Sequence, residues 1–145
     1  MKVKNEMKLQ LKSRSVNEGY ARMAVSAFAC ELDPNVEELN DIKTAVSEAV
    51  TNCIVHAYNN ELGTIYITVK LLENSTVEIK IRDRGCGIED VKQAMTPLFT
   101  TLGGDRSGLG FSVMESFSDS LKVTSKKGKG TTVTIVKRIK GKASF

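Results

Sequence analysis

The sequence predicts a two-layer α/β sandwich, in which helices cover one face of a mixed, mostly antiparallel sheet. Two observations lead to this fold class. Runs rich in β-branched residues occur at residues 64–72, 76–82 and 131–139, and segments with the apolar spacing of helices lie before and between them. The length of 145 residues is that of one domain with one core. We therefore expect residues 1–145 to form a single domain.

The chain opens on a predicted strand that leads into a helix. Met7, Leu9 and Leu11 alternate with polar residues, which is the period of a half-buried strand. Ser15 is a residue type that often caps a helix N-terminus, and apolar residues keep helical spacing from there to Phe28. We therefore expect a strand and then a helix that Ser15 caps.

A long second helix is predicted from Asp33 onward. The Asp33 carboxylate could cap the free amides of a helix start, and Pro34 suits the first helical position. Apolar residues continue at helical spacing to about Tyr58. The pattern therefore predicts one long helix across this segment.

Three polar residues of this helix recur at four-residue intervals, namely Glu48, Asn52 and His56. Four residues turn an ideal helix by about 40° beyond one full turn, so the three side chains form a slanting stripe. The apolar residues of the same segment occupy a neighbouring face. The stripe should therefore lie at the edge of the core, where a cleft can form.

Two strand pairs are predicted after this helix. The runs at residues 64–72 and 76–82 are joined by three residues and predict a hairpin. Residues 121–125 and 131–139 predict a closing pair around a Lys-Gly-Lys-Gly turn.

The segment between the two strand pairs is rich in glycine. Residues 85–110 hold six of the eleven glycines of the chain, which indicates a mobile loop, with a short helix near residues 90–95. A further helix is predicted over residues 111–117.

Composition narrows the class of protein. No apolar run approaches the roughly 20 residues that span a bilayer, and the charged start of the chain lacks the apolar stretch of a signal peptide. We therefore expect a cytoplasmic protein with no membrane contact. Cys30, Cys53 and Cys86 are odd in number and far apart, which argues against a disulfide framework and a zinc site.

The net charge of +4 is concentrated in basic residues between positions 126 and 142. Single-stranded nucleic-acid binding favours aromatic residues among the basic ones, and only Phe145 lies near this run. A solvated basic face is the simpler interpretation, so we expect no direct contact with nucleic acid.

The polar stripe has the residue types that phosphate chemistry uses. A carboxylate on a rigid helix beside a polyphosphate can take the proton of an attacking hydroxyl or water, which makes Glu48 the candidate general base. The carboxamide oxygen of Asn52 suits Mg²⁺, which completes its shell with waters and phosphate oxygens. His56 is the sole histidine of the sequence, and we assign it structural support rather than chemistry.

Two glycine-containing segments could hold a nucleotide. Asp83 ends a predicted strand and precedes Gly85 and Gly87, which let a backbone turn sharply and approach a flat ligand. The Asp83 carboxylate could then accept from the amino group of adenine. The same residues also make ordinary turns without a ligand.

The second of these segments opens the predicted last helix. Free backbone amides and the helix dipole favour phosphate at Gly108, Leu109 and Gly110, and Arg106 would add positive charge. A glycine-rich loop without a ligand is again the alternative.

The three signals follow one another on the expected kinds of element, and in this combination the chain resembles the GHKL superfamily of ATPases and kinases. The matching residues are Glu48, Asn52 and His56 in its N-box, Asp83, Gly85 and Gly87 in its first glycine box, and Gly108 and Gly110 in its second, within the segment Arg106-Ser107-Gly108-Leu109-Gly110. Residues 130–132 resemble its last box, which implies that Thr131 assists adenine binding through water. The resemblance also implies that ATP lies between helices and sheet, under a lid at about residues 89–106.

Within the superfamily, the chain is most similar to bacterial anti-sigma factors that are also serine-protein kinases, and this similarity runs nearly end to end. It rests on residues 42–52, 97–101 and 106–111. The resemblance implies a homodimer that binds and inhibits a sporulation sigma factor, and that uses Mg-ATP to phosphorylate a serine of a small anti-anti-sigma protein. It also implies that the first helix binds partners through Asn17, Glu18 and Arg22, although these could simply be solvated polar residues.

Two alternatives remain open. One is an ATP-dependent module that sequesters the sigma factor without transferring phosphate, and such a binder has no use for a carboxylate at Glu48. The other is a stress-response anti-sigma kinase of the same branch, which only its partners would distinguish.

Overall fold

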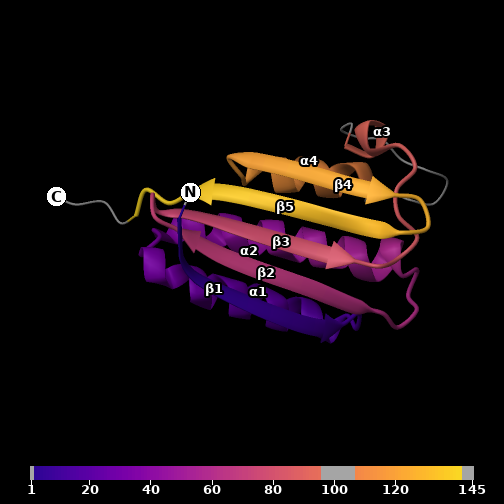
Figure 1. Ribbon diagram of the computed structural model, residues 1–145, viewed down its shortest axis with the longest axis horizontal. Helices are drawn as coiled ribbons and strands as arrows, with labels where there is room; N and C mark the ends of the chain where they lie inside the picture. The colour runs from indigo at the N-terminus through magenta and orange to yellow at the C-terminus, as the bar shows by residue number, and fades with distance from the viewer. Residues whose placement is uncertain (1, 96–106, 142–145) are drawn as a thin grey trace.

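The computed structural model describes residues 2–95 and 107–141, and it has two layers. The first layer is one sheet in the order β1-β2-β3-β5-β4 (Figure 1). The strands are β1 (Val3–Lys12), β2 (Thr64–Leu72), β3 (Thr76–Asp83), β4 (Ser120–Lys126) and β5 (Gly130–Arg138). All four neighbouring pairs are antiparallel, so the described sheet is purely antiparallel rather than mixed.

Helices form the second layer and cover one face of the sheet, as the α/β sandwich prediction requires. Figure 1 shows α1, α2 and α4 behind the sheet and α3 beside its β4 edge. The helical elements are α1 (Val16–Ala29), the 3₁₀ turn η1 (Cys30–Leu32), α2 (Val36–Asn52), the π-helical turn η2 (Cys53–Ala57), α3 (Val91–Met95) and α4 (Ser107–Ser116). No helix in the described part of the chain is long and apolar enough to cross a membrane.

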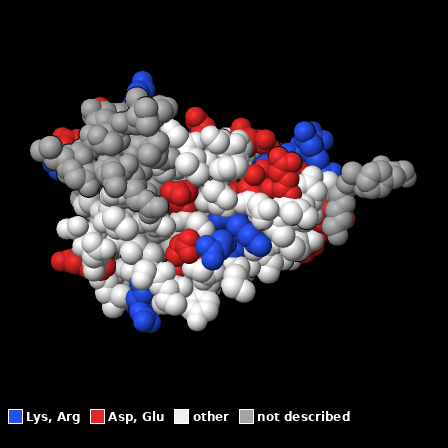
Figure 2. All heavy atoms as spheres, turned by 180° about the vertical axis from the view of Figure 1, so that it is seen from behind, with Lys and Arg blue, Asp and Glu red and all other residues white. Residues whose placement is uncertain are grey.

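Seen from the helical side, acidic and basic side chains lie close to one another (Figure 2).

The core fills the space between the two layers. Because strand side chains alternate between faces, every second residue of the central strands points at the helices. The fully buried side chains of this core include Ile65, Ile67, Val69 and Leu71 from β2, Val77, Ile79 and Ile81 from β3, and Ile42, Val46 and Val50 from α2. The core thereby fixes the position of α2 over β2 and β3.

The start of α1 agrees with its prediction in position but not in the capping contact. The helix begins at Val16, directly after Ser15, but Ser15 has a helical backbone and its side chain caps no amide. The amide group of Asn17 donates to the carbonyl oxygen of Lys12, at 2.9 Å. A capping side chain usually has an extended backbone, so residue type predicted the position of the cap but not its missing hydrogen bond.

The start of α2 is likewise shifted from the predicted Asp33 and Pro34. Asp33 has a φ of 54° and ends the 3₁₀ turn, and Asn35 is the helix cap. The Asn35 side chain accepts from the backbone N–H of Glu38 at 2.8 Å, and the Glu38 carboxylate accepts from the N–H of Asn35 at 3.1 Å. This reciprocal capping box satisfies two donors at once and therefore sets the helix start.

The Glu38 carboxylate also fastens the segment after β5 to α2. It accepts from the backbone N–H groups of Lys140 at 2.7 Å and Gly141 at 3.0 Å. Glu38 is buried, and Lys137 forms an ion pair with Asp41 one turn further along the helix, at 3.2 Å. The N-terminal end of α2 is therefore tied to the end of β5.

The other end of α2 widens into the π-helical turn Cys53–Ala57. Tyr58 donates its backbone N–H to the carbonyl oxygen of Cys53, five residues back, at 3.0 Å. Such turns inside helices are rare and often mark functional sites. Here the turn delivers the last part of the predicted long helix to the end of β3.

Candidate functional site

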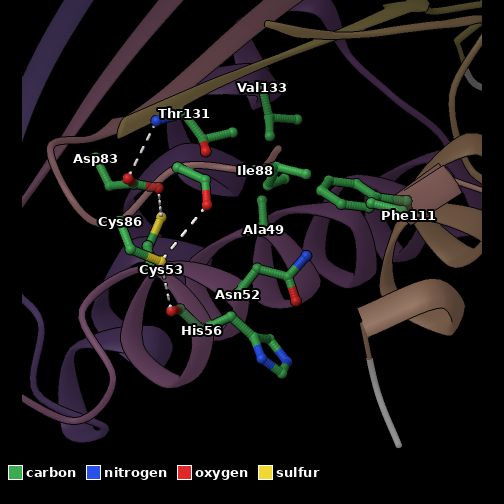
Figure 3. A pocket seen from close by; sticks show the side chains of 13 residues that line it. Ala49, Asn52, Cys53, His56, Asp83, Cys86, Ile88, Phe111, Thr131 and Val133 are labelled. Atoms are coloured by element: carbon green, nitrogen blue, oxygen red, sulfur yellow. Dashed lines mark hydrogen bonds between the residues drawn. The ribbon is translucent and has the colours of Figure 1, made fainter. Parts of the chain in front are cut away.

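A cavity of about 210 Å³ opens where η2, the end of β3 and the start of β5 meet α4. Its labelled lining includes Ala49, Asn52 and Cys53 from the α2 side, Asp83 and Thr131 from the sheet, and Phe111 from α4 (Figure 3). Cavities that hold a whole drug-sized ligand measure about 300–1,000 Å³. This one therefore suits a single flat ring system rather than a complete nucleotide.

Asp83 forms the polar floor of the cavity. It continues the inward-facing series of β3 after Ile79 and Ile81, so strand alternation turns its carboxylate towards the helices. Asp83 pairs with Thr131 in the sheet register, and it is only 5% exposed. A buried carboxylate among apolar neighbours is costly unless donors surround it.

Both oxygens of this carboxylate have donors. Oδ1 accepts from the backbone N–H of Gly85 at 2.9 Å and of Thr131 at 3.2 Å. Oδ2 accepts from the thiol of Cys53, with a sulfur-to-oxygen distance of 3.6 Å (Figure 3). Burial raises the pKa of Asp83, and the hydrogen bonds from Gly85, Cys53 and Thr131 oppose this rise.

Gly85 and Gly87 allow the loop after Asp83 to pack closely. A Cβ on Gly85 would lie 2.2 Å from the carbonyl oxygen of Ala57, which accepts from the N–H of Cys86. Gly87 has a φ of +74°, and a Cβ there would lie 2.1 Å from the carbonyl oxygen of Lys126. The loop is thus pressed between η2 and the β4–β5 turn, which is a structural reason for both glycines.

Glu48 and Asn52 of α2 meet the first turns of α4. A Cβ on Gly110 would lie 3.1 Å from Oδ1 of Asn52 and 3.5 Å from Oε2 of Glu48. The structure therefore brings the polar stripe and the second glycine segment together, although they are nearly 60 residues apart in the sequence. Asn52 lines the cavity, whereas Glu48 lies one turn away from it.

The side-chain amide nitrogen of Asn52 lacks a hydrogen-bond partner among the described residues. Nδ2 of Asn52 is buried and makes no hydrogen bond to the described residues. An orphaned amide beside a helix start fits a site for an anionic ligand, because such an atom is costly to bury unpaired. No group of three or more His, Cys, Asp or Glu side chains in the described residues could hold a metal ion. A magnesium ion here would therefore take most of its ligands from phosphate and water, with Asn52 as a protein ligand.

The remaining predicted nucleotide residues are placed as follows. Ser107, Gly108 and Leu109 form the start of α4, and Arg106 lies outside the described residues, as does most of the predicted lid at 89–106. The hydroxyls of Thr131 and Ser125 share a hydrogen bond of 2.7 Å. The ring of His56 points away from Asp83 (Figure 3).

The predicted partner residues lie on the first turns of α1. Arg22 forms an ion pair with Glu18 at 3.1 Å, and the same guanidinium nitrogen lies 3.3 Å from the hydroxyl of Ser47, the residue before Glu48. Asn17 is occupied by its bond to Lys12. The Glu18–Arg22 pair is thus the part of this predicted set that lies against α2.

Sequence reasoning missed two residues, one in the cavity wall and one that bonds to the loop after Asp83. The thiol of Cys53 binds Asp83, and the hydroxyl of Tyr58 accepts from the backbone N–H of Arg84 at 2.7 Å. Cys53 lies four residues after Ala49 and three before His56. This helical spacing indicates that Cys53 shares the helix face that lines the cavity. No local pattern in the sequence indicates the role of Tyr58.

Comparisons with known proteins identify the family of the chain. A family model described as the histidine kinase-like ATPase domain matches residues 11–137. The chain is 54% identical over 140 residues to the anti-sigma F factor of Caldanaerobacter subterraneus subsp. tengcongensis, covering 96% of this chain and 97% of that protein. It is 49% identical over 138 residues to the anti-sigma F factor of Geobacillus kaustophilus, covering 94% of each.

Solved structures show the same fold. The structure of the RsbU and RsbW domains of a Mycobacterium tuberculosis protein matches 93% of this chain and 32% of that one, with a TM-score of 0.69 and 20% identity. A histidine kinase domain from Erythrobacter litoralis matches 86% of this chain and 60% of that one, with a TM-score of 0.58 and 19% identity. The matched family model, the near full-length relatives and the GHKL arrangement of the site lead to one conclusion: the chain belongs to the histidine kinase-like ATPase domain family and, within it, to the anti-sigma F factors.

Proposed function

We propose that this chain is an ATP-binding anti-sigma factor that inhibits a sporulation sigma factor and phosphorylates a serine of its anti-anti-sigma partner. The observation that most directly supports an ATP site is the close approach of Gly110 to Asn52 and Glu48. This contact lies beside the cavity whose floor is Asp83. It puts a helix N-terminus, a carboxamide and a carboxylate at one end of a cavity for a flat base. This combination suits a nucleotide whose phosphates extend from the cavity towards α4.

Each residue has a defined task in this proposal. Asp83 accepts from the amino group of adenine, and the first turn of α4 faces the phosphates. Asn52 offers its carboxamide oxygen to Mg²⁺, which neutralises charge on the phosphate oxygens when it is bound. Glu48 lies one helical turn before Asn52 on α2 and farther from the cavity for the base. In this proposal it is on the side of the phosphates, where a general base is needed.

In the transfer step, the partner's serine oxygen would form a bond to the γ-phosphorus, and the bond to the leaving ADP oxygen would break. Glu48 would accept the serine proton. General bases of this kind contribute about 10²- to 10⁴-fold to the rate. A protein that only bound the nucleotide would have no need of this carboxylate.

The partner assignments rest on the relatives. Two proteins that match this chain almost end to end are named anti-sigma F factors, which supports a sigma factor as the bound partner. We place the partner surface at the start of α1, around the Glu18–Arg22 pair, and we propose that the active form is a homodimer in the cytoplasm. Light scattering of the purified chain would test the dimer.

The decisive experiment for the enzyme is transfer of labelled γ-phosphate from Mg-ATP to the small anti-anti-sigma protein. The controls are the Glu48→Gln variant, and Glu37→Gln as a matched change of an exposed glutamate on the same helix. Label on a partner serine with wild type and Glu37→Gln, and loss of label with Glu48→Gln, would support the kinase. Tight ATP binding without label would instead indicate a nucleotide-dependent sequestering module.

A further inference from the structure

Cys53 lines the cavity and contacts the carboxylate of Asp83. Its side chain is 4% exposed, and its sulfur is 3.6 Å from Oδ2 of Asp83 (Figure 3). The other oxygen, Oδ1, already accepts from two backbone N–H groups, those of Gly85 and Thr131. Each carboxylate oxygen has about two lone-pair sites, so Oδ1 is filled and Oδ2 has one site left.

We propose that Cys53 is a positioning residue that makes Asp83 select adenine. Its thiol occupies one lone pair of Oδ2 and leaves the second for the exocyclic amino group of the base. This inference rests on the proposed function, because it requires that the cavity bind an adenine nucleotide.

The selection follows from the protonation state of Asp83. An ionised carboxylate only accepts hydrogen bonds, so it pairs with the amino group of adenine and faces the carbonyl oxygen of guanine unfavourably. A protonated carboxyl group could donate to that carbonyl oxygen. Burial favours the protonated form, and the thiol is one of three donors that favour the ionised form. Loss of the thiol should therefore weaken adenine binding and also relax the choice of base.

The geometry suits this role, because the sulfur of Cys53 lies 3.6 Å from Oδ2 of Asp83 and the side chain is buried beside it. Within the described residues, other titratable or charged side chains surround this carboxylate. They are Cys86 and His56 in the cavity wall, Tyr58 at the end of η2, and Arg82, Arg84, Lys126 and Lys129 on the far side of Asp83 and Thr131.

The test compares Cys53→Ala with Cys53→Ser, and uses Val50→Ala as a control that removes a fully buried side chain from the same helix. ATP and GTP affinities are measured by calorimetry at several pH values. For Cys53→Ala we expect a loss of roughly 2- to 10-fold in ATP affinity at neutral pH, an ATP-to-GTP preference that falls, and an acid loss of ATP binding that begins at higher pH. Cys53→Ser keeps a donor and should lie closer to wild type than Cys53→Ala. Val50→Ala should keep the wild-type pH profile.

Two outcomes would overturn the positioning role while ATP binding itself stands. In one, Cys53→Ala has the wild-type pH profile and base preference. In the other, Cys53→Ser loses as much as Cys53→Ala, which would indicate packing rather than hydrogen bonding. A wild-type protein that binds no ATP at any pH would overturn the proposed function, and the base selection with it. An NMR titration of the Asp83 carboxyl group in the nucleotide-free protein measures the effect of the thiol on the pKa of Asp83 without ATP. A pKa of Asp83 that is the same in wild type and Cys53→Ala would also contradict the inference.

Discussion

Gly110 of α4 lies against Asn52 of α2 so closely that a Cβ on the glycine would be 3.1 Å from Oδ1 and 3.2 Å from Nδ2 of the amide. This separation is tighter than nearly all real Cβ contacts, so the Asn52 side chain would have to shift by a few tenths of an ångström. The contact joins the residues proposed to meet the phosphates and the metal ion. It therefore offers a direct way to disturb the site without removing a functional group.

Gly110→Ala should weaken ATP binding by roughly 5- to 100-fold, if the usual overpacking cost of about 1–3 kcal/mol falls on the bound state. Folding stability should change little, because the preference of the helix for alanine over glycine, about 1 kcal/mol, offsets the strain of the close contact in the unbound protein. Calorimetry with ATP and thermal unfolding measure the two effects. Gly19→Ala is the matched control, since a Cβ there would meet nothing closer than 3.8 Å. Equal ATP affinity in both variants would show that the contact does not shape the site.

Glu48→Gln should lower the rate of phosphate transfer by about 10²- to 10⁴-fold and leave ATP affinity nearly unchanged, since Glu48 lies outside the cavity for the base. Single-turnover transfer of labelled phosphate and calorimetry separate the two. A transfer rate like that of Glu37→Gln would exclude Glu48 as the base.

Asp83→Asn should weaken ATP binding by about one to two decades. A hydrogen bond to a charged acceptor is worth roughly 1.5–3 kcal/mol, and the substitution removes the charge while it keeps the shape. Glu78→Gln on the same strand is the control, because its side chain points to the opposite face of the sheet. Titration calorimetry with ATP gives the result, and unchanged affinity would remove Asp83 from base recognition.

ATP affinity should fall as pH is lowered through the raised pKa of Asp83. Burial is the main cause of that raised pKa, and only the ionised carboxylate accepts from adenine. The raised pKa of Asp83 has the opposite effect on folding stability, which falls as pH rises. Between the unfolded and folded pKa values the folded state binds more protons, so this group lowers the free energy of unfolding as pH rises. Asp83→Asn, titrated in parallel, corrects for protonation of the nucleotide itself, and identical pH profiles would refute the assignment.

Glu38→Gln should lower the free energy of unfolding by about 1–3 kcal/mol at neutral pH, because the buried carboxylate accepts from three backbone N–H groups. Burial alone would raise the pKa of Glu38, but hydrogen bonds from Lys140, Asn35 and Gly141 and the charge of Lys137 lower it overall. Its contribution is therefore complete above the unfolded pKa and is lost as pH falls through the folded pKa. Denaturant unfolding at neutral and acid pH should show the difference between wild type and variant shrinking in acid. A difference that stays constant would contradict this role.

Periodicity was sufficient to predict the layers of the fold, because strand and helix patterns are properties of neighbouring residues. The ranges predicted for β2 and β3 end within one residue of the observed strands. The capping contacts were less predictable. The first helix begins directly after Ser15, as predicted, but the Ser15 side chain does not cap it, and Asn35 rather than Asp33 caps α2. Which candidate caps depends on backbone angles that the surrounding fold imposes.

The site shows the same division. Glu48, Asn52, Asp83 and Gly110 could be singled out from spacing and family resemblance, and the structure brings them to one region. The bond from Cys53 to Asp83 spans 30 positions, so the helical spacing that places Cys53 on the cavity face could not identify its partner. The π-helical turn was also missed, because it depends on contacts such as the bond from Cys86 N–H to the carbonyl oxygen of Ala57.

The anchoring of α2 has a consequence for how the molecule would respond to a ligand. Glu38 ties the beginning of this helix to the segment after β5, and the turn after Asn52 is tied to the loop after β3. With both ends fastened, we expect α2 to move little, so that Glu48 and Asn52 keep their positions relative to each other. Adjustment to different nucleotides should then fall on α4, so that recognition is divided between a stationary half and a half that adapts.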